Sequence, residues 1–107
     1  MIRSVLKMTP RPGRADDVVD LFRRAQVIER ALGVEGCHDV SLLLSDDEIL
    51  VTASWADADA YQAWIDHPER NAMGDDLNDL LVDPITAESV AGLYRVALAG
   101  SQAEGKA

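Results

Sequence analysis

Two strand-like runs joined by three polar residues constrain the fold of this chain more than any other feature. They extend from Cys37 to Leu44 and from Glu48 to Trp55, and Ser45-Asp46-Asp47 lies between them. Both runs are rich in aliphatic residues, and short polar side chains between such runs favour a tight turn. The segment therefore predicts a β-hairpin of two antiparallel strands, against which the rest of the chain must pack.

The residues before the hairpin indicate a strand followed by a helix. Ile2 to Met8 partly alternates between apolar and polar residues and ends at a turn rich in Pro and Gly. From Ala15 to Leu32 apolar residues recur every three or four positions, with two aspartates in the first turn and Gly33 after the last. We expect one amphipathic helix over this stretch, with its apolar face on a sheet.

The residues after the hairpin indicate helical segments and a last strand. Asp57 offers an N-cap for a helix that Pro68 interrupts. A second helical piece carries apolar residues from Met73 to Leu81, and residues 86–98 return to strand-like composition. Residues 1–99 are therefore expected to form one domain, and the small, polar tail 100–107 is expected to be disordered.

The resulting order, β-α-β-β-α-β, predicts an α+β fold of the ferredoxin-like type, a four-stranded antiparallel sheet with helices on one face. The hairpin strands are apolar on both sides, because Leu42 and Leu44 alternate with Leu43, and Val51 alternates with Leu50. A chain of 107 residues has helices for one face only. We therefore predict a homodimer closed sheet to sheet, which is a dimeric α/β barrel.

Charge and composition exclude several classes of partner. The formal net charge of −9 argues against nucleic acid and against anionic lipid, since both are bound through clustered Lys and Arg. The longest apolar runs are far shorter than the roughly 20 residues of a membrane helix. The single cysteine, Cys37, cannot form an internal disulfide, and the first residues do not resemble a signal peptide. We expect a cytoplasmic protein.

Aromatic residues concentrate between Ser54 and Pro68, which holds both tryptophans, one tyrosine and one histidine. Aromatic rings with polar edges are costly to bury unless the N–H or O–H finds a partner, so their concentration indicates a pocket wall as well as core packing. Trp64 and Tyr61 are predicted to bind a planar substrate, or alternatively to pack in the core. Trp55 also belongs to this candidate set, although a strand-ending Trp more often fixes a helix to the sheet.

Two histidines are candidate general bases. His67 lies where the predicted helix ends, and its ordinary pKa near 6.5 suits proton transfer from a phenol; the alternative is contact with the helix C-terminus in solvent. His38 is the rival base if it points to the same side of its strand as Val40. Neither histidine belongs to a cluster with metal-ligand spacing, so we predict no metal site.

Arg95 and Asn71 complete the candidate site. Arg95 lies inside the apolar run 93–98, where a buried guanidinium needs a carboxylate, a carbonyl or a ligand anion. It is predicted either to stabilise a phenolate or to form an ion pair with one of the many acids. Asn71, soon after Pro68, is a candidate amide donor to substrate or a helix cap.

These residues give the chain a resemblance to the antibiotic biosynthesis monooxygenase family. The resemblance spans Ile2 to Leu98 and rests on the element order, the strand-ending Trp55, Tyr61 with Trp64 one helical turn later, and the closing His67. It implies a dimeric barrel whose pockets bind a small aromatic substrate, namely a polycyclic phenol, anthrone or quinol of polyketide or other secondary metabolism. It also implies a cofactor-independent monooxygenase that uses molecular oxygen as co-substrate without metal, flavin or haem.

Three functions remain open from the sequence. A cofactor-independent oxygenase needs only to bind an electron-rich anion, stabilise it and exclude water, because the substrate supplies the electrons. A non-redox polyketide cyclase or isomerase would use a histidine and Arg95 for proton transfer, and would act without oxygen. A non-catalytic binding protein would hold its ligand without turnover.

Overall fold

The computed structural model describes residues 1–46, 48–68, 70, 74–85 and 92–100. The four strands of this part form one antiparallel sheet in the order β2-β3-β1-β4, with helices on one face. The predicted ferredoxin-like α+β fold is confirmed. Its elements are β1 (Ile2–Met8), α1 (Ala15–Arg24), α2 (Val27–Leu32), β2 (Cys37–Leu44), β3 (Ile49–Trp55), α3 (Ala58–Ile65), α4 (Gly74–Leu80) and β4 (Gly92–Arg95).

The predicted hairpin forms the β2 and β3 strands. The backbone N–H of Ser45 donates to the carbonyl of Glu48 at 3.0 Å, which closes the turn. β1 lies beside β3 in a register that opposes Ile2 to Trp55 and Met8 to Ile49. The central position of β3 and β1 explains why their helix-facing side chains are the most deeply buried of the sheet.

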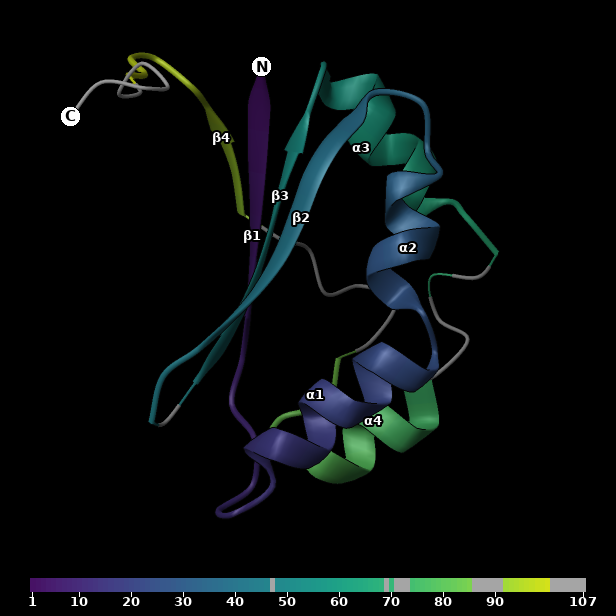
Figure 1. Cartoon of the computed structure of the whole chain (residues 1–107), viewed down its shortest axis with the longest axis vertical. Helices are drawn as coiled ribbons and strands as arrows, with labels where there is room; N and C mark the ends of the chain where they lie inside the picture. The colour runs from purple at the N-terminus through teal and green to yellow at the C-terminus, as the bar shows by residue number, and fades with distance from the viewer. Residues whose placement is uncertain (47, 69, 71–73, 86–91, 101–107) are drawn as a thin grey trace, which may run out of the picture.

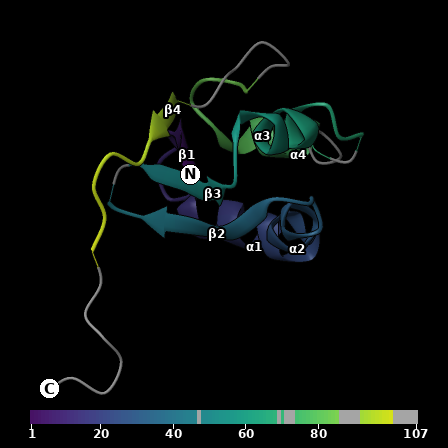
Figure 2. The same ribbon diagram turned by 90° about the horizontal axis from the view of Figure 1, so that it is seen from above.

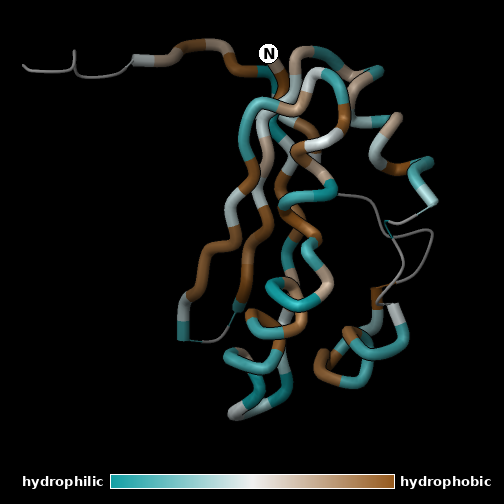
Figure 3. The backbone as a smooth tube through the Cα atoms, turned by 45° about the vertical axis from the view of Figure 1, so that its right-hand side comes forward, coloured by the Kyte–Doolittle hydropathy of each residue, from teal (hydrophilic) through white to brown (hydrophobic). Residues whose placement is uncertain are grey.

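The helices lie together on one side of the sheet (Figure 1), and the view from above shows the opposite face bare (Figure 2). The register places Val5, Leu43, Leu50 and Thr52 on this bare face, together with the charged Arg3, Lys7 and Asp39. Leu43 and Leu50 lie near the hairpin turn, where the residues of both strands, on either face, are coloured as hydrophobic in Figure 3. The bare face therefore carries Leu43 and Leu50 beside Lys7 at the turn end, Val5 and Thr52 in its middle, and Arg3 and Asp39 at its other end.

The expectation of one helix from Ala15 to Leu32 is wrong. The chain breaks between α1 and α2 at Gln26, whose φ of 55° lies in the left-handed region. The break changes the chain direction, so that α1 packs beside α4 while α2 packs along β2. A straight helix could not follow both neighbours, because the strands beneath it twist.

The last strand is shorter than the predicted run 86–98. β4 covers Gly92–Arg95, and residues 86–91 lie outside the described part. Arg95 pairs with Ile2, the first residue of β1, and the N–H of Val96 donates to the carbonyl of Met1 at 3.1 Å. The strand ends there because β1 offers no further partner. Most of the predicted tail, 101–107, also lies outside the described residues.

The buried side chains of the described residues form two clusters. The aliphatic cluster lies between the α1/α4 end of the helical layer and the sheet, and the aromatic cluster lies between α3 and the sheet. The aliphatic cluster consists of Met8, Val18, Leu21, Phe22, Ile49, Leu77 and Leu81. The aromatic cluster consists of Ala53, Trp55, Ala60 and Tyr61, with Trp64 packed against it.

Candidate functional site

Trp55 is fixed in the aromatic cluster by its polar edge as well as by its ring. Its side chain is 1% exposed, and its indole N–H donates to the hydroxyl of Ser4 at 2.9 Å. The ring of Tyr61 meets it edge to face, with ring centroids 5.7 Å apart and an interplanar angle of 73°. Trp55 thus joins β3 to β1 and α3, and its N–H is already used within the protein.

Tyr61 reaches this position because α3 is capped and oriented by Asp57. The carboxylate of Asp57 accepts the backbone N–H of Ala60 at 2.9 Å, which confirms the predicted N-cap. Tyr61 is 5% exposed, yet its hydroxyl finds no hydrogen-bond partner among the described residues. A buried hydroxyl without a partner costs about 1–3 kcal/mol, and such groups in native proteins often face a ligand or water.

Two adjoining cavities lie between the helices and the sheet. One of about 70 Å³ is walled by the aromatic cluster, and one of about 90 Å³ extends toward the aliphatic cluster. Both are mostly apolar, and one set of five residues lines both: Leu6, Val27, Val51, Trp64 and Arg70. The first cavity is also lined by Ser4, Ala31, Val40, Ala53, Trp55, Tyr61 and Ile65.

Trp64 and Arg70 are the two residues with hydrogen-bond donors in their side chains that line both cavities. Trp64, on the last turn of α3, is half-buried, and the ring of His67 lies against it with centroids 5.7 Å apart. Arg70 is half-buried, and its backbone N–H donates to the carbonyl of His67 at 3.1 Å. Within the described part of the chain, no salt bridge or side-chain hydrogen bond engages its guanidinium.

The structure brings together only part of the predicted site. Tyr61, Trp64 and Trp55 line one cavity, while His67 contacts Trp64 without lining either cavity. Asn71 lies outside the described residues. Arg70, which lines both cavities, was not among the sequence candidates.

Two expectations about side-chain position are wrong. Arg95 is exposed rather than buried, because β4 is an edge strand whose four residues all remain accessible in the single chain. His38 is also exposed and does not follow the alternation of its strand, because a register shift between Cys37 and Asp39 inserts it as a bulge. Neither residue lines the cavities between helices and sheet.

The thiol of Cys37 packs at the margin of the aromatic cluster. Partial burial, and secondly the negative charge of Asp39, raise the pKa of this thiol above its ordinary value. The thiolate is the reactive form of cysteine, so the shift makes Cys37 a poor nucleophile at neutral pH. Its place in the site is structural.

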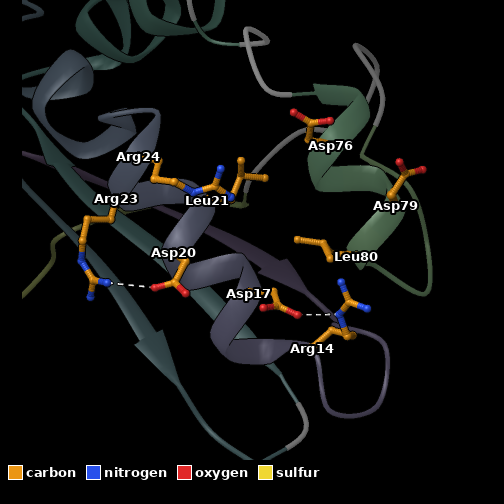
Figure 4. A pocket seen from close by; sticks show the side chains of 9 residues that line it. All are labelled: Arg14, Asp17, Asp20, Leu21, Arg23, Arg24, Asp76, Asp79 and Leu80. Atoms are coloured by element: carbon orange, nitrogen blue, oxygen red, sulfur yellow. Dashed lines mark hydrogen bonds and ion pairs between the residues drawn. The ribbon is translucent and has the colours of Figure 1, made fainter.

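A larger hollow lies on the surface between α1 and α4, with a volume of about 740 Å³. Its walls are mostly charged, and the two ion pairs drawn in Figure 4 join Arg14 to Asp17 at 2.6 Å and Arg23 to Asp20 at 2.9 Å. All four side chains are at least half exposed, so water screens them. This groove does not offer the dry surface that an aromatic ligand requires.

The described residues contain no group of three or more His, Cys, Asp or Glu side chains placed to hold a metal ion. Among the same residues, no helix combines the length and apolar character needed to cross a membrane.

The fold and cavities define a class of protein, a small α+β domain that encloses an aromatic-lined cavity between its helices and its sheet. The chain belongs to the antibiotic biosynthesis monooxygenase family, whose sequence profile matches residues 1–75. Among curated proteins, no relative matches the chain.

Solved structures share this fold at low sequence identity. A conserved protein from Methanosarcina mazei Go1 has a TM-score of 0.72 and 22% identity, with 88% of this chain and 90% of that chain covered. SnoaB, a cofactor-independent oxygenase from Streptomyces nogalater, has a TM-score of 0.67 and 19% identity, with 98% and 97% covered. An antibiotic biosynthesis monooxygenase homologue from Nitrosomonas europaea has a TM-score of 0.71 and 10% identity, with 87% and 86% covered.

Proposed function

We propose that this chain is a cofactor-independent monooxygenase that oxidises an electron-rich hydroxyarene in the cavities between α3 and the sheet. The observation that carries the proposal is that Tyr61 lines one cavity together with Trp64 and Arg70, while its buried hydroxyl has no partner among the described residues. Membership of the family supports it, as does the likeness in fold to SnoaB, which is described as a cofactor-independent oxygenase.

The reaction requires no electrons from outside. A hydroxyarene that has lost its proton transfers one electron to dioxygen, and the two radicals combine to form a carbon–oxygen bond and a peroxide. Breaking the oxygen–oxygen bond leaves one oxygen on the product and releases the other as water. An anthrone or a quinol supplies all four electrons, because its carbon skeleton ends at the quinone level. The protein has to bind the anion, stabilise its charge and keep bulk water away.

The residues of the site divide this work. Trp64 packs against the substrate ring, and the Tyr61 O–H donates to a substrate oxygen. The guanidinium of Arg70 stabilises the negative charge. We retain His67 as the candidate base, because its ring contacts Trp64, whereas His38 and Arg95 are exposed in the single chain. Metal, flavin and haem have no part in the proposed reaction.

We also propose that the chain is a homodimer, closed through the bare face of the sheet. Support comes from Val5, Leu43 and Leu50, which are apolar side chains on that face. Light scattering would give twice the mass of the chain, and Leu50→Lys would reduce the mass to that of a monomer. A monomeric mass of the native chain at micromolar concentration would contradict this assembly.

The function is tested by oxygen uptake with metal-free, haem-free protein over a panel of naphthols, anthrones and quinols. The proposal expects saturable uptake above autoxidation, one dioxygen consumed per substrate, and one atom of ¹⁸O₂ in the product. Trp64→Ala lowers the rate, while Arg95→Gln, as a control on the exposed edge strand, leaves it unchanged. Conversion of substrate under argon would establish a cyclase or isomerase instead, and quenching of tryptophan fluorescence without any conversion would establish a binding protein.

A further inference from the structure

The size of the two cavities limits what they hold. An enclosed apolar cavity of about 150 Å³ holds one benzene ring, and sites for drug-sized ligands occupy about 300–1,000 Å³. The two cavities here are about 70 Å³ and about 90 Å³, and they share five lining residues. Joined by a movement of the half-buried Trp64, they offer room for one ring. Three fused rings, as in an anthrone, need clearly more room than one ring and exceed this space.

The charge of the residues that line the two cavities also limits which ligand they can bind. Arg70 is the sole basic residue that lines either cavity in the described part of the chain, and no acidic residue lines them. Arg70 as a whole is half-buried, and among the described residues its guanidinium has no carboxylate partner. Removing a cation from water is costly unless a partner balances its charge. An anionic oxygen on a bound ring would supply that partner.

The hydroxyl of Tyr61, a residue that lines the smaller cavity, is the second polar group of the site. It is buried and without a partner among the described residues, whereas the N–H of Trp55, on the same wall, is satisfied by Ser4. A ligand that presents one oxygen to Arg70 and another to Tyr61 would satisfy both groups. A ring with two oxygen substituents meets this requirement, and one with a single oxygen does not.

We propose that Arg70 is the specificity-determining residue of this site and that it selects a one-ring dihydroxyarene, bound as its anion between Tyr61 and Trp64. The inference rests on the proposed function and narrows its substrate from polycyclic to single-ring compounds. The chemistry balances for this class: a hydroquinone and dioxygen give a hydroxyquinone and water. One carbon–hydrogen bond is replaced by a carbon–oxygen bond, and the ring supplies all four electrons.

Binding can be measured without turnover, because both tryptophans of the chain line the smaller cavity and their fluorescence reports on it directly. The first probe is 4-nitrophenol, which ionises readily, does not consume oxygen, and has nitro oxygens that can accept from Tyr61 as the second oxygen-bearing group. The second probe is 4-nitroanisole, the same ring with an ether that cannot ionise. Arg70→Gln is expected to weaken the binding of 4-nitrophenol at least tenfold and to leave the binding of 4-nitroanisole unchanged. Arg70→Lys restores part of the affinity for 4-nitrophenol, which excludes misfolding as the cause, and Arg95→Gln is the matched control.

A size comparison completes the test. A three-ring hydroxyanthracene is expected to bind at least tenfold more weakly than 4-nitrophenol. The inference would be overturned if Arg70→Gln lowered the affinity for both nitroaromatic probes equally, or lowered it for neither. It would also be overturned if the three-ring compound bound more tightly than 4-nitrophenol. Any of these results together with oxygen uptake from an anthrone would leave the proposed function standing. Binding of the probes as expected, without oxygen uptake from any quinol, would instead overturn the proposed function and leave the ligand specificity standing.

Discussion

The two buried clusters lie on the same face of one sheet, yet they are built differently. The aliphatic cluster contains only apolar side chains, all of them at most 7% exposed, with α1 and α4 packed over them. The aromatic cluster combines rings with polar groups: one indole N–H is satisfied by Ser4, and one phenol hydroxyl has no partner among the described residues. It also borders a cavity, and Trp64 above it is only half-buried.

This difference separates stability from function within a small domain. Close packing of apolar side chains stabilises the fold, and the aliphatic cluster meets an inner cavity only at Phe22 and Leu77. An unpartnered hydroxyl and an unfilled cavity lower stability, and both are useful only where something binds. The predictions below test that separation, beginning with the largest expected effect.

Leu81→Ala is expected to lower the free energy of unfolding by about 3 kcal/mol, because Leu81 is 1% exposed in the aliphatic cluster and its removal leaves a cavity. Urea unfolding followed by circular dichroism measures the change. Leu32→Ala is the matched control, since Leu32 is 45% exposed and its truncation is expected to cost about 1 kcal/mol or less. Equal losses in the two variants would show that the aliphatic cluster does not carry the stability.

Ser4→Ala is expected to cost about 2 kcal/mol, because the buried N–H of Trp55 then loses its acceptor. Ser54→Ala offers a matched comparison. Ser54 is 1% exposed, but its hydroxyl has no partner among the described residues, so removing it is expected to change stability by less than about 0.5 kcal/mol. Urea unfolding measures both changes. A similar loss of stability in the two variants would contradict the role of the Ser4–Trp55 hydrogen bond.

Tyr61→Phe is expected to leave stability unchanged or raise it by up to about 1 kcal/mol, because it removes a buried hydroxyl without a partner. The same variant is expected to bind 1,4-hydroquinone several-fold more weakly under anaerobic conditions, as measured by fluorescence titration. Tyr94→Phe, on an exposed tyrosine of β4, should affect neither quantity. A loss of stability in Tyr61→Phe would show that its hydroxyl has a protein or water partner and is not reserved for a ligand.

The smallest effect concerns Cys37 at the edge of the aromatic cluster. Its raised pKa leaves a smaller fraction of thiolate at every pH below that pKa, so alkylation by iodoacetamide at pH 8 should be slower in the folded chain than in urea. Asp39→Asn removes the second cause of the shift and should speed the reaction of the folded chain. Identical rates in the folded and unfolded chains would remove the evidence that this margin of the cluster is desolvated.

Local patterns were enough to predict the features that depend on neighbouring residues. The hairpin and the cap at Asp57 follow from turn and capping chemistry, and the aromatic wall from residues 54–68 was evident from composition. The break at Gln26 was missed because glutamine is an ordinary helix former and nothing local indicates a left-handed conformation. The break lets α1 pack beside α4 and α2 along β2, and these are tertiary contacts that the local sequence does not reveal.

Site residues that depend on tertiary position were harder to predict. Arg95 occupies an apolar run, but exposure follows from the place of β4 at the sheet edge, which the run itself does not reveal. Arg70 had a signal that was available, since it is the only Lys or Arg between Arg30 and Arg95 in a strongly acidic chain. In an acidic sequence, an isolated Arg next to a helix that carries aromatic residues is a candidate binding residue.

An anaerobic crystal structure with 1,4-hydroquinone would show whether the space between Tyr61, Trp64 and Arg70 is the substrate site. The account predicts one ring between Tyr61 and Trp64, with one oxygen within hydrogen-bonding distance of the Arg70 guanidinium and the other near the Tyr61 hydroxyl. A ring bound instead in the charged groove between α1 and α4, or on the bare face of the sheet with the inner cavities unchanged, would contradict it.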